Sequence, residues 1–314
     1  MKKIIKSCLD NFEFTKGLYT KLRYYNAKSK ANISDEEYAI NYYYKKFGRR
    51  LNLKNPETFD EKIWWLKIHY HNDLLTQCAD KLLVRDYVES CGLGYILNDL
   101  YAVYDKVEDI DIDNLPDKFY LKCNHVSGGN VACVDKEVFD LKNAKKKLNW
   151  YMGINQYYIT REWQYKNIMP RILAEKYLEN EDKSPLVDYK FYCFNGKFKI
   201  FMICNNVANI DGSHNNEKNS FENFYDINKQ PLNIVDDSNI LTEEYINFPK
   251  NYDKMVKYAE LLAQKIPFVR VDFYEINNEI KFGELTFTPA GGCHNYKPEK
   301  YHKIFGSYLD LSKI

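Results

Sequence analysis

Two antiparallel strands joined by a tight turn are predicted by the stretch FVRVDFYEINNEIKFGELTF, residues 268–287. Apolar and polar residues alternate along both halves, a period of two that is typical of strands with two different faces. Arg270 and Asp272 share a face of the first strand, and Glu284 and Thr286 share a face of the second. The stretch therefore predicts a β-hairpin with a polar face made by these four side chains.

Whether the two acidic residues meet depends on the register of the hairpin. A two-residue turn at 277–278 would place Asp272 opposite Gly283 and would turn Glu284 to the other face. A three-residue loop or a bulge would instead place Asp272 opposite Glu284 and would bring the arginine and the threonine opposite each other. The second register is the one we predict.

Two carboxylates on adjacent strands of one face repel each other unless a cation lies between them. Hard oxygen ligands of this kind suit Mg²⁺, which takes one or two carboxylates and completes its shell with phosphate oxygens and water. Arg270 beside them can bind a phosphate in a bidentate manner. The alternative is a solvated face on which Asp272 pairs with Arg270 or a lysine. The small-residue loop TFTPAGG at 286–292 favours the metal site, since a ligand can approach its backbone.

The overall composition is that of an ordinary soluble globular protein. The 314 residues carry 45 basic and 44 acidic side chains, a net charge of +1, so no global field attracts nucleic acid or a lipid surface. The eight cysteines contain no CxxC pair, and neither a signal-peptide core nor an apolar run of about 18 residues is found. We therefore expect reduced thiols and a cytoplasmic enzyme without a transmembrane segment.

Helices and strands are predicted in an irregular order. Residues 1–70 read as polar helices, in which Thr58 is an N-cap and Glu61 completes a capping box. Strict alternation of strand and helix is missing, so the pattern predicts the α+β class. The other predicted helices lie near 80–90, 140–151 and 251–264, and the other strands at 118–124, 130–134, 171–178, 188–194 and 197–204.

A second hairpin is predicted over residues 188–204, where Asn-Gly at 195–196 is a strong turn signal. Asp188, Lys190 and Lys199 share one face of this hairpin, and we expect that face to meet a nucleotide. A solvated strand lysine is the alternative for Lys199. The other face is expected to be apolar and to combine Tyr189, Phe191 and Cys193 with Phe198, Ile200 and Met202.

A short glycine loop follows the strand at 118–124. Lys122 lies near the end of that strand, and Ser127, Gly128 and Gly129 follow. Backbone N–H groups of such a loop can cradle phosphate oxygens, and the lysine adds a point charge. The loop is not a Walker A motif, because no Gly-Lys-Ser/Thr follows. An ordinary β-turn is the alternative interpretation.

Four further side chains are candidates for contacts with a substrate. His125 lies beside the glycine loop and His294 follows the loop at 286–292, so either could touch substrate or be an ordinary loop histidine. Arg161 could anchor an anionic sugar, and Trp163 could stack on a sugar ring. The alternative for these two is a structural ion pair beside a buried tryptophan.

An acidic stretch at 109–113, DIDID, contains the Asp-x-Asp pattern of many nucleotide-sugar glycosyltransferases. It lies before Leu115 and Pro116, where we expect a solvated connector. This pattern makes a glycosyltransferase one possible function. A nucleotide- or glycan-binding protein without turnover and an ATP-dependent kinase that phosphorylates a sugar hydroxyl are two others.

Taken in order, several blocks of the chain resemble the TupA-like ATP-grasp family, which is linked to teichuronopeptide and other cell-surface polysaccharide biosynthesis. The resemblance covers residues 50–310, and the order of the blocks makes it specific. The blocks are NPETFDEK (55–62), DK (80–81), FYLKCNHVSGG (119–129), REW (161–163), PRILAEKYL (170–178), DYKF (188–191), FVRVDF (268–273) and FGELTFTP (282–289).

The resemblance implies roles for the matching residues. Lys81 and Lys122 would contact nucleotide phosphates beneath the glycine loop. Arg270 and Lys190 would be the cationic catalytic residues near the transferred phosphate. The adenine hinge and the ribose contact would come from Glu175, Lys176, Tyr177, Leu178 and Asp188. The Mg²⁺ ligands would be Asp272, Glu284 and Thr286, the last standing where many ATP-grasp ligases have asparagine.

The resemblance also implies an architecture and a reaction. We expect a helical N-terminal region at 1–79, a first ATP-grasp subdomain with the glycine loop at 80–180, and a second with the metal-binding hairpin at 181–314. ATP and Mg²⁺ would be clasped between the two β-rich subdomains. The expected enzyme is a carboxylate–amine ligase that acts through an acyl phosphate, with a uronic-acid carboxyl as the small-molecule or glycan partner.

Overall fold

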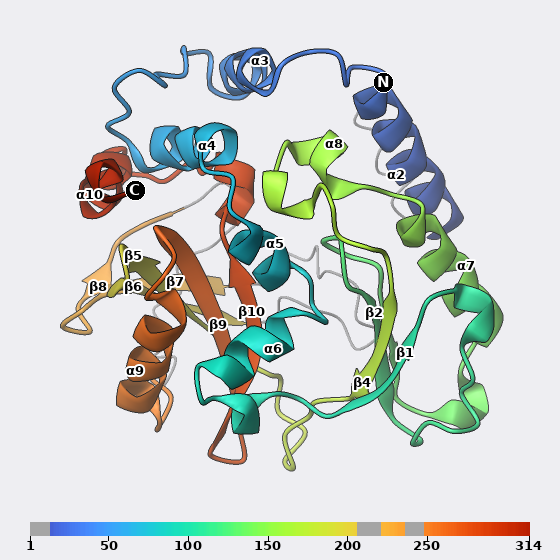
Figure 1. Ribbon diagram of the computed structural model, residues 1–314. Helices are drawn as coiled ribbons and strands as arrows, with labels where there is room; N and C mark the ends of the chain where they lie inside the picture. Colours follow the sequence, from blue (N-terminus) through green and yellow to red (C-terminus); the bar gives the residue numbers. More distant parts are fainter. Residues whose placement is uncertain (1–12, 206–220, 236–247) are drawn as a thin grey trace.

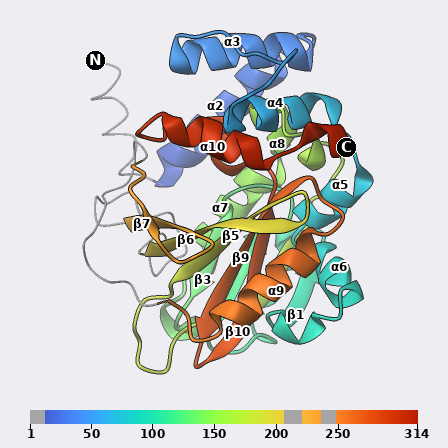
Figure 2. The ribbon, with the colours of Figure 1, turned by 90° about the vertical axis from the view of Figure 1, so that its left-hand side faces the viewer.

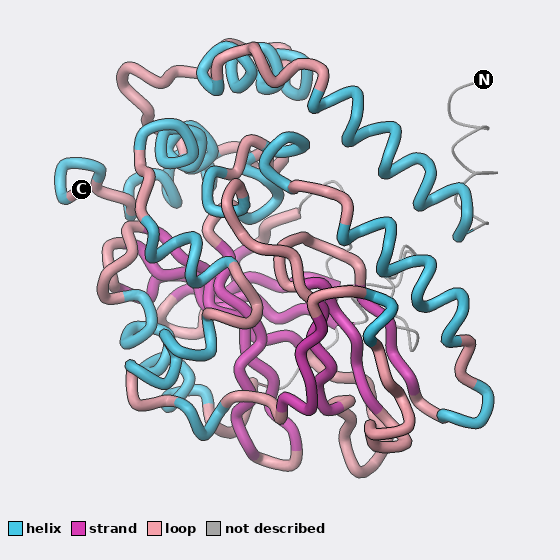
Figure 3. Tube along the Cα trace, turned by 45° about the vertical axis from the view of Figure 1, so that its right-hand side comes forward, coloured by secondary structure: helices cyan, strands magenta, loops and turns pink. Residues whose placement is uncertain are grey.

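The computed structural model describes residues 13–205, 221–235 and 248–314. Two antiparallel sheets form its centre, and helices lie around and above them (Figure 1, Figure 3). The mixture of helices and antiparallel sheets confirms the α+β prediction. Residues 1–12 of the expected N-terminal region lie outside the described residues. Within the described residues, no helix is both long enough and apolar enough to cross a membrane.

The first sheet has four strands in the order β1-β4-β2-β3. Its members are β1 (Leu100–Tyr104), β2 (Phe119–Cys123), β3 (Asn130–Cys133) and β4 (Ile172–Lys176). Apolar side chains of these strands pack with α7 (Leu141–Met152) and α8 (Gln156–Thr160) into one core. The glycine loop joins β2 to β3, so the sheet positions it directly.

The second sheet has six strands in the order β10-β9-β5-β6-β7-β8. Its members are β5 (Asp188–Phe194), β6 (Lys197–Asn205), β7 (Phe221–Asp226), β8 (Pro231–Leu232), β9 (Phe268–Ile276) and β10 (Glu279–Thr286). Both predicted hairpins, β5–β6 and β9–β10, are therefore present.

Different helices cover the two faces of the second sheet. On one face, α9 (Tyr252–Ala263) packs across β5 and β9, as Figure 2 shows, and α5 (Asp73–Ala79) and α6 (Val84–Ser90) join the same core. The other face is partly covered by α4 (Phe59–His69) and α10 (Lys300–Tyr308). The rest of that face carries the polar residues of the hairpin. The core of the second sheet contains residues of α5 and α6, which lie on either side of residue 80. The division of the chain into three parts stays a prediction.

The predicted apolar face of the β5–β6 hairpin is wrong in its second strand. Tyr192 pairs with Ile200 but Cys193 pairs with Phe198, so Lys199 is an extra residue in β6. This bulge reverses the facing of every β6 residue beyond it. Ile200 and Met202 consequently pack in the core beneath α4, whereas Phe201 and Ile203 join Tyr189, Phe191 and Cys193 beneath α9.

The N-terminal helices lie at one end of the molecule (Figure 1). The start of α4 has the predicted capping box, since the Thr58 side chain accepts from the Glu61 N–H and the Glu61 side chain accepts from the Thr58 N–H. Before it come α2 (Glu13–Lys28) and α3 (Asp35–Phe47). The short 3₁₀ helices are η1 (Gly94–Ile96), η2 (Val107–Asp109), η3 (Lys136–Val138), η4 (Trp163–Tyr165), η5 (Pro289–Gly292) and η6 (Leu311–Lys313).

Candidate active site

The β9–β10 hairpin has the register that we predicted. Asp272 lies opposite Glu284 and Arg270 lies opposite Thr286, because the pairing shifts between Phe282 and Glu284. The turn itself has two residues, both with positive φ, so the extra residue is Gly283 in the bulge. A Cβ at this position would lie 2.9 Å from the Asp272 carbonyl oxygen, which explains the glycine.

A dense group of charges occupies the polar face of this hairpin. The Arg270 guanidinium donates to both Asp272 oxygens, from Nε at 2.7 Å and from Nη2 at 2.5 Å. Its Nη2 also lies 3.3 Å from Glu284 Oε1 and 3.0 Å from Thr286 Oγ1. Thr286 in turn donates to Glu284 at 2.8 Å. The three expected metal ligands thus surround one guanidinium.

Lys190 brings a second cation to the same acid from the neighbouring strand. It lies opposite Asp272 in the β5–β9 register, and its Nζ is 3.0 Å from Asp272 Oδ2 and 3.2 Å from Asp188 Oδ1. Burial alone would lower the pKa of Lys190, but the two carboxylates outweigh burial and raise it well above its ordinary value. Lys190 therefore stays charged, and Asp272 pairs with an arginine and a lysine, as the alternative to a metal site predicted. At 2% exposed, however, Asp272 does not lie on a solvated face.

Glu284 differs from Asp272 in its access to solvent, since its side chain is 52% exposed. Burial of part of the site opposes its ionisation, but Arg270, Lys190 and Lys81 outweigh this and lower the pKa of Glu284. An ionised and accessible carboxylate beside a buried one is a suitable pair for a hard divalent cation.

Lys81 lies beside the glycine loop. Its Nζ donates to the Val126 carbonyl at 2.6 Å, just before the loop at 127–129. Burial lowers the pKa of Lys81, an effect that Glu284 opposes and Lys122 reinforces. The pKa of Lys81 therefore responds to one charged residue from each sheet.

The first sheet contributes its own ion pair. Lys122 on β2 lies 2.5 Å from Glu175 on β4. The loop after β2 needs its glycines, since both have positive φ and a Cβ at Gly129 would lie 2.9 Å from the Tyr151 ring. The glycine loop is therefore held tightly against α7.

The remaining expected hinge residues lie at the end of β4. The Lys176 N–H donates to the Asp99 carbonyl at 2.9 Å, and its Nζ lies 3.3 Å from the carboxylate of the same aspartate. Tyr177 and Leu178 follow in a segment without regular secondary structure and are half-buried.

The four candidate substrate residues are engaged within the protein. The nitrogens of buried His125 lie 3.3 Å from Asn124 Oδ1 and 3.1 Å from the Ile154 carbonyl oxygen. Buried His294 lies 2.8 Å from Asp60 through its Nδ1. These are the positions of ordinary structural histidines, and a contact with substrate stays a prediction.

Arg161 and Trp163 also contact other residues of the protein, but they do not contact each other. Arg161 Nη1 lies 3.2 Å from Asp35 and Nη2 donates to the Lys30 carbonyl at 2.9 Å, which ties α8 to the N-terminal helices. Trp163 is half-buried and stacks on His71, with ring centroids 4.8 Å apart. The ion pair of Arg161 matches the structural alternative, whereas Trp163 keeps an exposed part.

The sequence analysis did not identify two tyrosines of the site, Tyr165 and Tyr274. The Tyr274 hydroxyl interacts with Asp188, which together with burial raises its pKa well above 10. Tyr165 has its pKa raised by burial and by nearby Glu162 and Glu284. Tyr274 could have been found, because it follows Arg270 and Asp272 at the same period of two. Tyr165 lies on η4 and has no such signal.

The three acids of the stretch at 109–113 are exposed, while Ile110 between them is buried in the core of the first sheet. Asp111 accepts hydrogen bonds from the Asp113 N–H at 3.0 Å and from Asn114 Nδ2 at 2.7 Å. It is thus the solvated connector that its composition predicts.

Comparison with known proteins points to one family. A family model described as TupA-like ATPgrasp matches residues 61–310. No curated protein matches the chain. Similar solved structures include a D-alanine–D-alanine ligase from Bacillus anthracis complexed with ATP, with 16% identity and a TM-score of 0.41 over 68% of this chain and 57% of that one. An L-amino acid ligase from Bacillus licheniformis has 12% identity and a TM-score of 0.45 over 82% of this chain and 56% of that one. The chain thus spans less than two thirds of the length of either.

Proposed function

The chain belongs to the TupA-like ATP-grasp family, and from this premise we propose that it is an ATP-dependent ligase that joins a carboxylate to an amine through an acyl phosphate. The carboxylate would be a uronic-acid group of a cell-surface polysaccharide or its precursor, and the amine would come from an amino acid. That choice of substrates rests on the family alone. Because ATP is required, we place the reaction in the cytoplasm.

The observation that carries the proposal is the cross-strand pair of Asp272 and Glu284 with Thr286 beside it. Its oxygen atoms fit Mg²⁺, which needs only one or two carboxylates from the protein when phosphate oxygens complete its shell. No group of three His, Cys, Asp or Glu side chains that could hold a metal occurs in the part of the chain that the structure describes. The donor set thus favours a hard ion that arrives with a phosphate ligand. When bound, Mg²⁺ would neutralise charge that develops on the transferred phosphoryl group.

The cationic residues of the site have a clear role in this proposal. Arg270 and Lys190 hold fixed positive charge next to the metal ligands, in a buried place where charge interacts strongly. A substrate carboxylate oxygen would attack the γ-phosphorus, and the bond to the bridging oxygen of ADP would break. The amine would then attack the acyl carbon, phosphate would leave and the amine proton would pass to solvent. Neither step needs a catalytic triad.

The first sheet would hold the rest of the nucleotide. We propose that Lys122 and Lys81 contact phosphates, that the loop at 127–129 closes over them, and that residues 175–178 line the adenine. Asp188 would accept from the ribose hydroxyls. The hydrogen bond from Lys81 to the carbonyl before the loop supports this arrangement, and the pKa of Lys81 responds to both Glu284 and Lys122.

One assay tests the reaction class. The chain is incubated with Mg-ATP, a panel of uronic acids and a panel of amines, and ADP and free phosphate are measured. We expect ADP and phosphate in equal amounts only when both a carboxylate and an amine are present, and loss of both products in Asp272→Asn. ADP without free phosphate would indicate a kinase, UDP release from a nucleotide sugar would indicate a glycosyltransferase, and ATP binding without turnover would indicate a binding protein. Each of these outcomes contradicts the ligase.

A further inference from the structure

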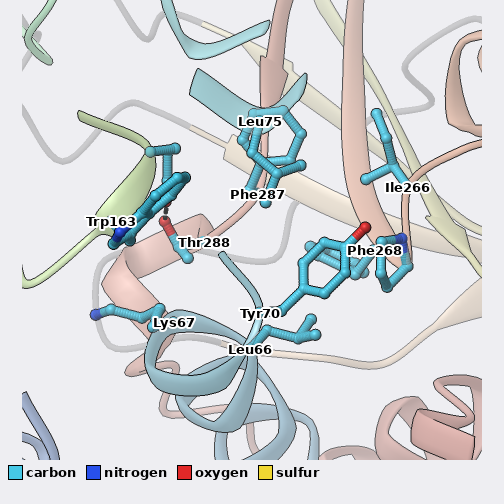
Figure 4. A pocket seen from close by; sticks show the side chains of 11 residues that line it. Leu66, Lys67, Tyr70, Leu75, Trp163, Ile266, Phe268, Phe287 and Thr288 are labelled. Atoms are coloured by element: carbon cyan, nitrogen blue, oxygen red, sulfur yellow. Dashed lines mark hydrogen bonds between the residues drawn. The ribbon is translucent and has the colours of Figure 1, made fainter. Parts of the chain in front are cut away.

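The pocket between α4 and η4 is small and enclosed by side chains (Figure 4). Its volume of about 20 Å³ has room for one water molecule. The ammonium of Lys67 on its wall points away from it, since its Nζ donates to the Gly291 carbonyl at 2.9 Å and lies 3.4 Å from the centre of the Trp64 ring. A more extensive feature lies on the exterior of the molecule, along α2.

Helix α2 lies at the edge of the molecule and packs on α7 and α8 (Figure 1). The inner side of the helix carries Tyr24, which is buried in the core of the first sheet and meets the Tyr158 ring edge-on, with ring centroids 6.3 Å apart. Just after the helix, the Lys30 carbonyl accepts a hydrogen bond from Arg161. The helix is therefore fixed to the body of the protein by one side.

The outer side of α2 carries large apolar side chains. Tyr19, Leu22 and Tyr25 are 56%, 60% and 62% exposed. At about 100° per residue, these three positions are neighbours on one side of the helix, opposite Tyr24. Single exposed apolar residues are ordinary on a protein surface. Three on one face of one helix form a patch that the described chain leaves open to solvent.

Basic side chains border this patch on both sides. By the same helical geometry, Arg23 lies next to Tyr19 along one border, and Lys21 and Lys28 lie next to Tyr25 along the other. Long basic side chains can keep their carbon chains against an apolar surface while their charged ends reach outward to anionic groups.

The charge of this segment differs from that of the whole chain. Residues 13–30 contain five basic residues and a single acid, Glu13, whereas the whole chain has a net charge of +1. Within the described residues, none of the cations at 21–30 forms an ion pair, and the next acid along the chain, Asp35, pairs with Arg161. The segment is therefore a local region of positive charge, which attracts an anionic surface over about one Debye length.

We propose that α2 lies on an anionic lipid surface, with its apolar face at the boundary of headgroups and acyl chains and its flanking cations at the phosphates. An apolar face with aromatic side chains and basic borders is typical of helices that lie in the plane of a membrane interface. The helix, Glu13–Lys28, is about 24 Å long and offers an extended line of contact. The proposal is independent of the ligase reaction.

Other occupants fit this face less well. In a symmetric dimer the same patch meets itself, so the cations of one α2 would lie against those of the other. A soluble polyanion would be held by Lys21 and Arg23 but would leave Leu22 exposed. An anionic lipid surface accepts both the apolar and the basic side chains at once.

Flotation of the full chain with lipid vesicles tests the proposal. Vesicles of phosphatidylcholine alone are compared with vesicles of phosphatidylglycerol and phosphatidylcholine in equal amounts, at low and at high salt, and the melting temperature of each protein is recorded. We expect wild type to partition onto the anionic vesicles about tenfold or more better than onto the neutral ones at low salt, and to lose much of this preference at high salt.

Two double variants separate the two parts of the face. Tyr19→Ser with Leu22→Ser should lower partition onto anionic vesicles by about tenfold or more. Lys21→Gln with Arg23→Gln should have an effect of similar size. Because these side chains are exposed or half-buried, both variants should keep the melting temperature of wild type. If one of them melts at a lower temperature, the other decides.

Matched controls remove the same chemistry elsewhere on the surface. Val138→Ser with Met169→Ser removes two apolar side chains that are 79% and 68% exposed. Lys257→Gln with Lys265→Gln removes two exposed charges, on α9 and just after it. Both controls should bind the vesicles as wild type does.

The proposal is overturned if wild type does not prefer the anionic vesicles, or if the α2 variants bind them as well as the controls do. Light scattering without vesicles and binding to heparin identify the other occupants. A dimer that is lost in Tyr19→Ser with Leu22→Ser, without any vesicle binding by wild type, would assign the face to a second copy. Heparin binding that needs Lys21 and Arg23, again without vesicle binding, would assign it to a soluble polyanion.

Discussion

Asp272 on β9 lies directly opposite Glu284 on β10, because Gly283 bulges out of the hairpin between them. The two-residue turn alone would set the glutamate one position out of register and on the wrong face. The bulge therefore places both acids beside Arg270, which contacts both of them. The proposed metal site depends on a single extra residue in one strand.

Replacing Gly283 with alanine should disturb this register. The new Cβ would lie 2.9 Å from the Asp272 carbonyl oxygen, so the backbone must move. We expect a loss of about 1–3 kcal/mol in the free energy of unfolding and a weaker stabilisation by Mg-ATP. Urea unfolding with and without Mg-ATP measures both. Gly153→Ala is the matched control, since a Cβ there meets nothing closer than 3.9 Å. Equal behaviour of the two variants would contradict the role of the bulge.

Asp272→Asn should leave two buried cations without their shared counter-ion. Lys190 and Arg270 both contact this carboxylate, at 3.0 and 2.5 Å. Removing one partner of a buried ion pair costs about 3–5 kcal/mol, and we expect the Mg²⁺ dependence of ATP binding to disappear as well. Calorimetric titration of ATP with and without Mg²⁺ checks the second effect. Asp182→Asn, on an exposed loop, should leave both quantities unchanged. Persistent Mg²⁺ dependence in Asp272→Asn would place the metal elsewhere.

Lys122→Met should weaken ATP binding. Lys122 is paired with Glu175 beside the glycine loop, where we propose that it contacts a phosphate. Loss of such a charge–phosphate contact should raise the Kd for ATP roughly tenfold, which corresponds to about 1.4 kcal/mol. Lys118→Met is the control, because Lys118 pairs with Glu179 at the surface, before the start of β2. Fluorescence titration with a labelled ATP analogue gives both values. A similar change in the two variants would argue against a specific phosphate contact.

The protein should lose stability in mild acid through His125. Burial, together with Lys81, lowers the pKa of His125 to about 4, although the Ile154 carbonyl favours the charged ring. The unfolded chain, with a histidine pKa near 6.5, therefore binds the proton more readily. Stability from this group is complete above the unfolded value and is lost as the pH falls from 6.5 toward 4, by up to about 3 kcal/mol.

Urea unfolding at several pH values checks this effect. We expect His125→Asn to be less stable at neutral pH but to lose less stability than wild type between pH 6.5 and 4.5, whereas exposed His69→Asn should follow wild type. Parallel pH profiles for wild type and His125→Asn would show that the buried ring does not resist protonation.

Much of the fold could be predicted where the signal is local. The capping box of Thr58 and Glu61 and the two hairpins follow from short patterns of capping, turn and alternation. The pairing of Asp272 with Glu284 does not follow from the turn, because the two-residue turn alone gives the other register and the bulge at Gly283 changes it. The β6 bulge at Lys199 could not be predicted, because one extra residue in a run of apolar side chains has no signature of its own.

The sequence by itself determined the family, the α+β class and the polar face that carries Asp272 and Glu284. These features rest on patterns of neighbouring residues, which period and turn chemistry encode directly. Only the tertiary structure decided that α4 brings Lys67 to the loop after β10, and that Lys190 and Arg270 share one carboxylate. These contacts join residues that are far apart in the chain. They depend on how whole helices and strands pack together, so no local sequence pattern could predict them.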